Sequence, residues 1–311
     1  MLTALLCISA VLIDQCYGEP PRKWHPLVGF GWIASFVETC IYGPSESSSS
    51  LRYIRGVAAV IVMLAPAIFF VSLFSIIPCI SWLGLVVDLA SLYLSIGARS
   101  LSEHAEAVGH ALLANKLPQA RDLLGMIVSR DIDNLNEEQI SQATVESVLE
   151  NGCDAIFGAL FWFILAGAPG VVLYRLANTL DAMWGYRTPR YIHFGWAAAR
   201  LDDILNWFPA RLTALSYVVI SSNPALAWSC WREQAPFWKS PNAGPVMATG
   251  AGALGLKLGG PARYKGVLSP RPALGKGSVP HAEDIDSAII LVRRVLCLWL
   301  SALLMRGLLF A

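Results

Sequence analysis

The chain has 311 residues, of which 55% are hydrophobic and only 14% are charged. Soluble domains carry about 25% charged residues, so this composition excludes an ordinary soluble domain and favours a membrane protein with polar loops. The formal net charge of +1 gives no indication of a nucleic-acid-binding surface. The seven cysteines form no CxxC pair, so we expect core thiols rather than a zinc or redox site.

The first third of the chain alternates apolar and polar segments. Residues 2–13 are apolar but too short to cross a bilayer, which takes about 20 residues, so a partial span or an interfacial helix is expected. A turn-rich loop, GEPPRKWHPLVGFG, follows, and the serine tract at 45–50 is predicted to be a flexible loop. Residues 56–77 and 82–96 are predicted spans. Asp88, in the second of these, has either a functional role or a helix-packing hydrogen bond.

Residues 97–151 form a polar, helical region. Leu101, Ala105, Val108 and Leu112 recur at helical spacing. Asn136 and Gln139 resemble a capping box, which predicts that a helix begins there and continues past residue 154.

Residues 155–174 contain the break signal GAPG at 167–170. The stretch 155–166 would rise only about 18 Å at 1.5 Å per residue, against a hydrocarbon core of about 30 Å. We therefore predict a helical hairpin that enters the membrane and returns.

The C-terminal third contains a Gly/Pro-rich loop at 240–288, predicted to be cytoplasmic, and a last apolar helix at 289–310. The spacing of Gly250, Gly252 and Gly255 fits GxGxxG, but no strand precedes it, so close helix packing is favoured. The fold class predicted is all-α, a polytopic integral membrane protein with broken or re-entrant helices and helical cytoplasmic loops. We expect residues 1–311 to form a single membrane-embedded domain.

Two ten-residue stretches share one pattern, L-x-N-x-x-D-A followed by an apolar residue, an aromatic residue and glycine. They are LENGCDAIFG at 149–158 and LANTLDAMWG at 176–185, and we call them the first and second signatures. If the hairpin forms, their amides and carboxylates lie on the same side of the membrane and face a common aqueous pocket.

Three clusters of acids, amides and arginines surround the signatures. In the first, Glu146, Glu150 and Asp154 share a helical face, where like charges repel unless a cation, arginine or metal, lies among them. The second and third comprise Arg175, Asn178, Asp181, Arg200, Asp202, Asp203, Asn206 and Arg211. Such residues suit a Mg²⁺–phosphate site; the alternative is helix capping and interfacial salt bridges.

Two further candidates are weaker. The loop SPNAG at 240–244 could present backbone N–H groups to a phosphate through Ser240, Asn242 and Gly244. His25, in KWHP, is a candidate substrate-binding residue, although a lone histidine beside an aromatic residue is more often a packing residue.

Taken together, several segments resemble the cobalamin-biosynthesis family of adenosylcobinamide-phosphate synthases, the CbiB/CobD family. They are spread over nearly the whole chain and read GEPPRKWHPLVGFG, SRDIDNL, ESVLENGCDAIFGALFW, YRLANTLDAMWGY, FGWAAARLDDILNWFPARL, SPNAG and AGALGLKLGG. The resemblance implies a multi-pass enzyme of the bacterial inner membrane whose active site faces the cytoplasm. It further implies ATP-dependent joining of (R)-1-aminopropan-2-ol, or its O-phosphate, to the free carboxylate of adenosylcobyric acid. Other late cobalamin-pathway membrane enzymes are possible partners, and no nucleic acid is expected.

On that basis each cluster residue receives a hypothetical role. The metal ligands for Mg²⁺ are Asp154, Asp181 and Asp203. The arginines that hold ATP phosphates or the corrinoid carboxylate are Arg175, Arg200 and Arg211. Glu150 is the candidate base for the amine, and Asn151 and Asn178 orient ligands. The alternative functions are a membrane transporter and a non-catalytic scaffold for corrinoid-pathway enzymes.

Overall fold

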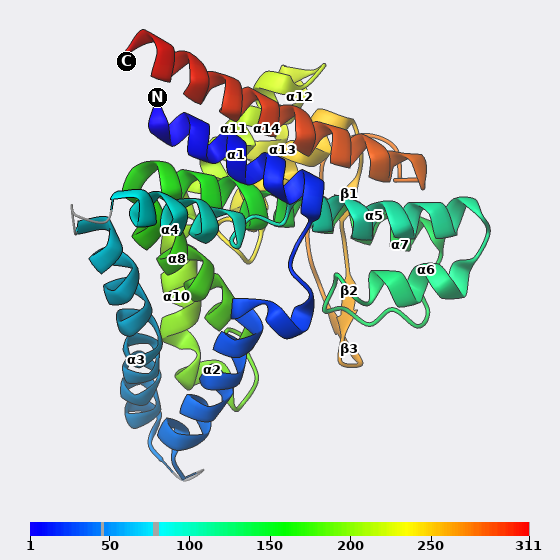
Figure 1. The fold of residues 1–311 in the computed structure, drawn as a ribbon. Coiled ribbons are helices and arrows are strands. Elements are labelled where there is room, and N and C mark those ends of the chain that lie inside the picture. Colours follow the sequence, from blue (N-terminus) through cyan, green and yellow to red (C-terminus); the bar gives the residue numbers. More distant parts are fainter. Residues whose placement is uncertain (45–46, 77–80, 311) are drawn as a thin grey trace. The chain divides into compact units, whose positions relative to one another are not determined.

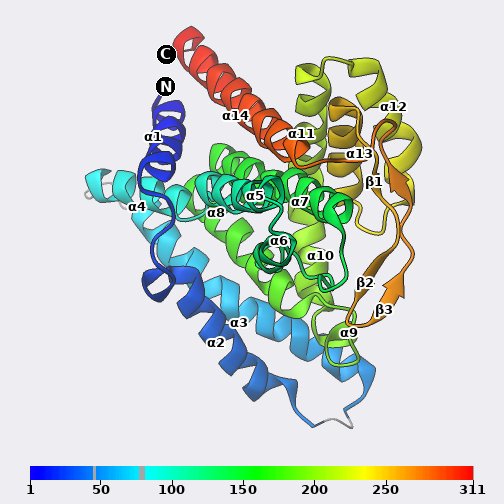
Figure 2. The same ribbon diagram turned by 90° about the vertical axis from the view of Figure 1, so that its right-hand side faces the viewer.

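The computed structural model describes residues 1–44, 47–76 and 81–310, which fall into two compact units (Figures 1 and 2). Unit 1 contains Met1–Gly97 and Gly158–Asn206, and unit 2 contains Ala98–Phe157 and Trp207–Ala311. Part of the predicted serine loop, the end of the first predicted span at Ile77, and Cys79 lie outside the described residues. None of the six described cysteines forms a disulfide. Cys7, Cys153 and Cys230 are buried, as expected of core thiols, whereas Cys16, Cys40 and Cys297 are exposed.

Every regular element described in unit 1 is helical. In chain order these are α1 (Leu2–Tyr17), η1 (Arg22–Trp24), α2 (Pro26–Tyr42), α3 (Ser49–Ile76), α4 (Ser81–Tyr93), α8 (Gly158–Trp184), α9 (Tyr191–Phe194) and α10 (Trp196–Leu205). The core contains the fully buried side chains of Tyr174, Trp184, Phe194 and Leu92. Helices α2 and α3 contact each other and lie side by side in the view of Figure 2.

Helix α8 is a helical hairpin, as predicted. Gly167 has φ 62° and ψ −152°, which interrupts the helix. A Cβ on Gly158 would lie 2.1 Å from the Tyr174 hydroxyl, and one on Gly170 would lie 2.5 Å from the Trp162 carbonyl oxygen. Residues 16 positions apart in a straight helix would be about 24 Å apart, so the two halves of α8 must run back along each other.

The carboxylate of Asp88 supports the hairpin at its bend. Its Oδ1 accepts a hydrogen bond of 3.2 Å from the backbone N–H of Ala168, one of the N–H groups that the second half of α8 leaves without a helical partner. Of the two roles considered for Asp88, the structure therefore shows the packing hydrogen bond.

Unit 2 combines helices with two short antiparallel ladders. Its helices are α5 (Ala98–Leu113), α6 (Leu117–Leu124), α7 (Glu137–Gly152), η3 (Cys153–Phe157), α11 (Trp207–Ile220), α12 (Pro224–Gln234), η4 (Ala235–Phe237), α13 (Ala243–Leu254) and α14 (Glu283–Leu309). Strand β1 (Leu258–Gly259) pairs with β4 (Ala273–Leu274), and β2 (Ala262–Tyr264) pairs with β3 (Val267–Ser269). The stretch 240–288 thus holds a helix and four strands in addition to loops. Glycines with positive φ lie at the end of β1 (Gly259 and Gly260), between β2 and β3 (Gly266) and directly after β4 (Gly275).

Local sequence signals in unit 2 behave as predicted. Asn136 and Gln139 form the reciprocal capping box that starts α7. Ala105, Val108 and Leu112 are buried along α5. In α13, Gly250 packs on Leu149 and Gly252 on Cys230, with Cβ-to-atom approaches of 2.7 Å and 3.0 Å that leave no room for a side chain. Gly250 and Gly252 of the GxGxxG pattern therefore serve close helix packing, whereas Gly255, with φ 66°, ends α13.

Within the described residues, four helical stretches are long and apolar enough to cross a membrane: Ser49–Phe74, Trp82–Leu113, Glu137–Trp184 and Glu283–Leu309. On α3, large apolar side chains such as Ile54, Ile61, Phe69 and Phe70 are more than half exposed, an arrangement that suits lipid. The chain is a polytopic membrane protein. Helix α1, with 16 residues, stays shorter than a full span, as predicted.

Candidate functional site

The second signature forms a hydrogen-bonded network in unit 1. Asn178, on α8, donates from Nδ2 to Asp202 Oδ1 at 3.1 Å. Asn206 donates from Nδ2 to both oxygens of Asp202 at 3.2 Å, and its own Oδ1 accepts from the Tyr174 hydroxyl at 2.8 Å. The network joins α8 to α10 and places the Asp202 carboxylate between two amides. Asp202 and Asn206 belong to the third sequence cluster but received no role there.

Three carboxylates of unit 1 lie close enough to influence one another: Asp181 on α8, and Asp202 and Asp203 on α10. Burial raises the pKa of Asp202, although hydrogen bonds from the two amides oppose the shift. Burial also raises the pKa of Asp203, against the opposing charges of Arg200 and Arg187. Burial of neighbouring carboxylates favours a bound cation or proton.

Asp202 and Asp203 have different partners, as their angular separation on a helix predicts. Asp203 forms a salt bridge of 2.9 Å with Arg200, one turn earlier on α10. Arg200, proposed to hold a substrate anion, is thus paired with a proposed metal ligand. Asp202 is the acid that faces the amides of the second signature.

The glycine that ends each signature has a packing role within unit 1. A Cβ on Gly185 would lie 1.9 Å from Asp181 Oδ1, so only glycine lets the Asp181 side chain fold over the end of α8. Gly158 ends the first signature and, as described above, accommodates the Tyr174 ring. The shared glycine is therefore explained by close approach in both signatures.

His25 and Arg175 also belong to unit 1. His25 caps α2, accepting at Nδ1 from the Leu27 N–H at 3.2 Å. Burial lowers the pKa of His25; the nearby Glu19 carboxylate opposes this, and the Arg175 guanidinium adds to it. The Nε of Arg175 is buried and has no hydrogen-bond partner among the described residues. An arginine with an unused donor beside a histidine is suited to an anionic ligand.

The first signature, apart from its final Gly158, lies in unit 2. Asn151 donates from Nδ2 to Ser147 Oγ at 2.9 Å. Glu150 lies in the last turn of α7 and Asp154 lies on η3, and both are half-buried. Glu146 forms salt bridges with Arg130 and with Arg271, the latter at 3.1 Å. The acidic face of α7 was expected to need a cation, arginine or metal. At Glu146 this need is met by the pair Arg130 and Arg271.

The SPNAG loop and Arg211, which were predicted separately, meet in unit 2. Arg211 donates from Nη1 to Asn242 Oδ1 at 3.0 Å and from Nη2 to the Pro241 carbonyl at 3.1 Å, and it stacks on Trp207 at 4.2 Å. Ser240 Oγ accepts from the N–H groups of Asn242 and Ala243 at 3.3 Å and 3.1 Å. The loop therefore satisfies part of its own N–H groups, and Gly244 is buried against Ala235 and Trp238.

A common pocket for the two signatures stays a prediction, because Asn151 and Asp154 belong to unit 2 while Asn178 and Asp181 belong to unit 1. Within residues 1–44, 47–76 and 81–310, no group of three or more His, Cys, Asp or Glu side chains is arranged to hold a metal ion. Mg²⁺ does not need such a group, because it is commonly bound by one or two carboxylates plus substrate phosphates.

Comparison with known proteins identifies the family. The sequence family described as CobD/Cbib protein matches residues 7–292. The chain belongs to the CobD/CbiB family. A cobalamin biosynthesis protein CobD from Chromobacterium violaceum is 54% identical over 96% of the chain and 95% of its own length. A protein of the same name from Stutzerimonas stutzeri is 51% identical over 100% of both chains, and one from Mycobacterium tuberculosis is 38% identical over 91% of the chain and 89% of its own length.

Membership of the CobD/CbiB family confirms the resemblance drawn from the sequence segments and places the chain in cobalamin biosynthesis. No solved structure is significantly similar to the chain. Residues that the sequence left without a role are Asp202, Asn206, Arg130 and Arg271. The i, i+4 spacing of Asp202 and Asn206 beside an aromatic residue was a usable sequence signal for these two. No comparable signal indicated the role of Arg130 or Arg271.

Proposed function

We propose that the chain joins (R)-1-aminopropan-2-ol, or its O-phosphate, to the free carboxylate of adenosylcobyric acid in an ATP-dependent reaction. The observation that carries the proposal is the match of residues 7–292 to the CobD/CbiB family. The acid–amide network of unit 1 supports it, because such groups suit a reaction that handles phosphate and carboxylate charge at a membrane surface.

The chemistry requires activation of the carboxylate. A carboxylate oxygen of the corrinoid attacks the γ-phosphorus of ATP, which gives an acyl phosphate and releases ADP. The amine then attacks the acyl carbon, phosphate leaves, and the nitrogen loses a proton to a base. Catalysis of both steps consists mainly of positioning the reactants and neutralising their charge.

The donor set of unit 1 fits Mg²⁺. Asp181, Asp202 and Asp203 offer carboxylate oxygens, the ligand type that Mg²⁺ prefers. A bound divalent ion would neutralise the polyphosphate and would offset the burial of Asp202. We assign Asp181 and Asp203 as ligands, with Asn178 and Asn206 orienting Asp202 through their amide N–H groups.

The remaining residues bind and orient the reactants. Arg175 offers a guanidinium with an unused Nε donor, and Arg211 presents its guanidinium at the SPNAG loop. Glu150 is the proposed acceptor of the amine proton. We place these groups on the cytoplasmic side, where ATP and the corrinoid precursor occur.

The proposal is tested with protein purified in detergent and supplied with adenosylcobyric acid, Mg-ATP and either amine, with the amide product detected by mass. We expect the wild-type chain to form product. Asp181→Asn should insert in the membrane and fold but form no product, and Asp286→Asn should retain activity. Asp286 is a matched control because it is exposed on α14. Near-normal turnover by Asp181→Asn would remove Asp181 from the site, and absence of product from the wild type would favour the transporter or scaffold alternatives.

A further inference from the structure

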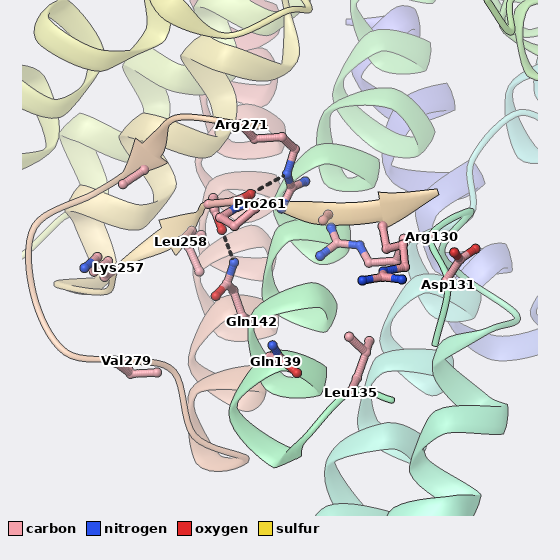
Figure 3. A pocket seen from close by; sticks show the side chains of 15 residues that line it. Arg130, Asp131, Leu135, Gln139, Gln142, Lys257, Leu258, Pro261, Arg271 and Val279 are labelled. Atoms are coloured by element: carbon pink, nitrogen blue, oxygen red, sulfur yellow. Dashed lines mark hydrogen bonds between the residues drawn. The ribbon is translucent and has the colours of Figure 1, made fainter. Parts of the chain in front are cut away.

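Unit 2 contains a cavity of about 570 Å³ between α7 and the segment that carries the four short strands (Figure 3). Its volume lies within the roughly 300–1,000 Å³ of small-molecule sites. Apolar side chains such as Leu258 and Val279 form part of the lining, and Arg130, Lys257, Arg263 and Arg271 supply positive charge. The cavity is thus basic in one part and apolar in another.

Two of the arginines are held in place by Glu146. This carboxylate is 2% exposed and contacts Arg130 and Arg271, whose side chains are 11% and 10% exposed. Arg271 also donates from Nε to the Gly260 carbonyl at 2.9 Å and stacks on Trp238 at 5.1 Å. Figure 3 shows Arg271 reaching the backbone beside Pro261. The guanidinium groups are therefore pre-oriented, which lowers the entropy cost of binding a ligand.

The acids found at the cavity among the described residues do not balance its positive charge. Glu146 offsets only one of its two arginines, and Asp131, the one acid among the lining residues, binds the backbone N–H groups of Lys265 and Gly266 at 2.8 Å and 2.7 Å. Within the described part of the chain, the side chains of Lys257 and Arg263 make no hydrogen bond or ion pair. Lys257 and Arg263 thus offer unused donors, and Glu146 compensates the charge of the arginine pair only in part. An anion is therefore the ligand that matches this cavity.

We propose that this cavity binds a phosphate-bearing small molecule, with the phosphate held by Lys257, Arg263 and the fixed arginine pair. Guanidinium forks suit phosphate oxygens, and the apolar lining beside Leu258 accepts the organic part of a phosphate ester. An adenosylated corrinoid is larger than the ligand class that a cavity of this volume encloses. Two molecules carry the required chemistry, a nucleoside triphosphate and a short amino-alcohol phosphate; this choice rests on the proposed function, in which both are substrates.

The test measures binding, without turnover, to the full chain in detergent by calorimetry. The probes are ATP and 1-aminopropan-2-ol O-phosphate, each without divalent cation. The wild type binds at least one of them. The double variant Lys257→Gln/Arg263→Gln weakens that binding by about tenfold or more, because two charge-assisted contacts are lost. Since neither side chain is paired among the described residues, we expect the variant to unfold at the wild-type temperature.

Arg232→Gln is the matched control, because Arg232 is an exposed arginine of α12 that does not line the cavity. Loss of ATP affinity alone in the double variant identifies the polyphosphate as the occupant, and loss of aminopropanol phosphate affinity alone identifies the monoester. Equal affinities of the double variant and Arg232→Gln overturn the proposal, as does a wild type that binds neither probe. Because no product is measured, failure here is distinct from failure of the proposed amide synthesis.

Discussion

Glu146→Gln is the substitution with the largest stability effect that we expect in unit 2. The Glu146 carboxylate accepts hydrogen bonds from Arg130, from Arg271, from Gln142 at 2.8 Å and from the Gly259 N–H at 2.8 Å. It thereby joins α7 to β1 and to the arginine that precedes β4. Glutamine has nearly the same shape but no charge, so both guanidinium groups lose their counter-ion.

The magnitude follows from burial. All three side chains of the triad are at most 11% exposed, and removing one partner of a buried ion pair costs about 3–5 kcal/mol because a charge is left uncompensated. The matched control is Glu233→Gln, which breaks the exposed pair of Glu233 and Lys276. Exposed pairs contribute little because water screens them, so this control should unfold at the wild-type temperature.

Two measurements check the expectation. Thermal unfolding in detergent, followed by tryptophan fluorescence, should show a clearly lower midpoint for Glu146→Gln than for Glu233→Gln. Trypsin should cleave the strand segment at the exposed Lys265 sooner in Glu146→Gln, because β1 loses its anchor on α7. A Glu146→Gln protein destabilised by less than about 1 kcal/mol, the range of surface pairs, would refute the reasoning that the triad is an electrostatic anchor.

Two further predictions concern unit 1. Gly167→Ala should lower the free energy of unfolding by about 1–3 kcal/mol, because the backbone angles of Gly167 lie in a region reserved for glycine. The control Gly29→Ala should not lower it, because there is open space at the position of its Cβ. Equal midpoints of thermal unfolding for the two variants would contradict this prediction. Asp202→Asn should change the pH dependence of stability. The raised pKa of Asp202 means that its contribution to stability is present below about pH 4 and is lost as the pH rises through the folded-state pKa. The variant should therefore gain stability relative to the wild type as the pH rises above about 4 without divalent cations. A difference that does not vary with pH would argue against a buried Asp202.

Much of the local structure could be predicted because its causes are local. The GAPG break predicts the hairpin of α8, since glycine admits backbone angles that other residues avoid and proline removes a helical N–H donor. The capping box at Asn136 and Gln139 depends on residues only three positions apart. The membrane class follows from composition, and the family follows from segments distributed along the chain.

The candidate sites could be predicted only in part. The second signature indicated Asn178 and Asp181, but the acid that Asn178 contacts, Asp202, lies 24 positions away. The repeat of the pattern indicated a shared chemistry but could not show which neighbour each amide would meet. Sequence spacing limits which residues share a helix face; it does not specify which face of another helix packs against it.

The sequence by itself determined the membrane class, the broken helix and the residue types available for phosphate and carboxylate chemistry, because these depend on composition and short-range backbone constraints. Only the tertiary structure decided that Arg130 and Arg271, 16 and 125 positions from Glu146, converge on that carboxylate and line a basic cavity. The physical reason is that ion pairing inside a protein depends on the distance and burial that packing creates, and neither is encoded in the spacing of residues along the chain.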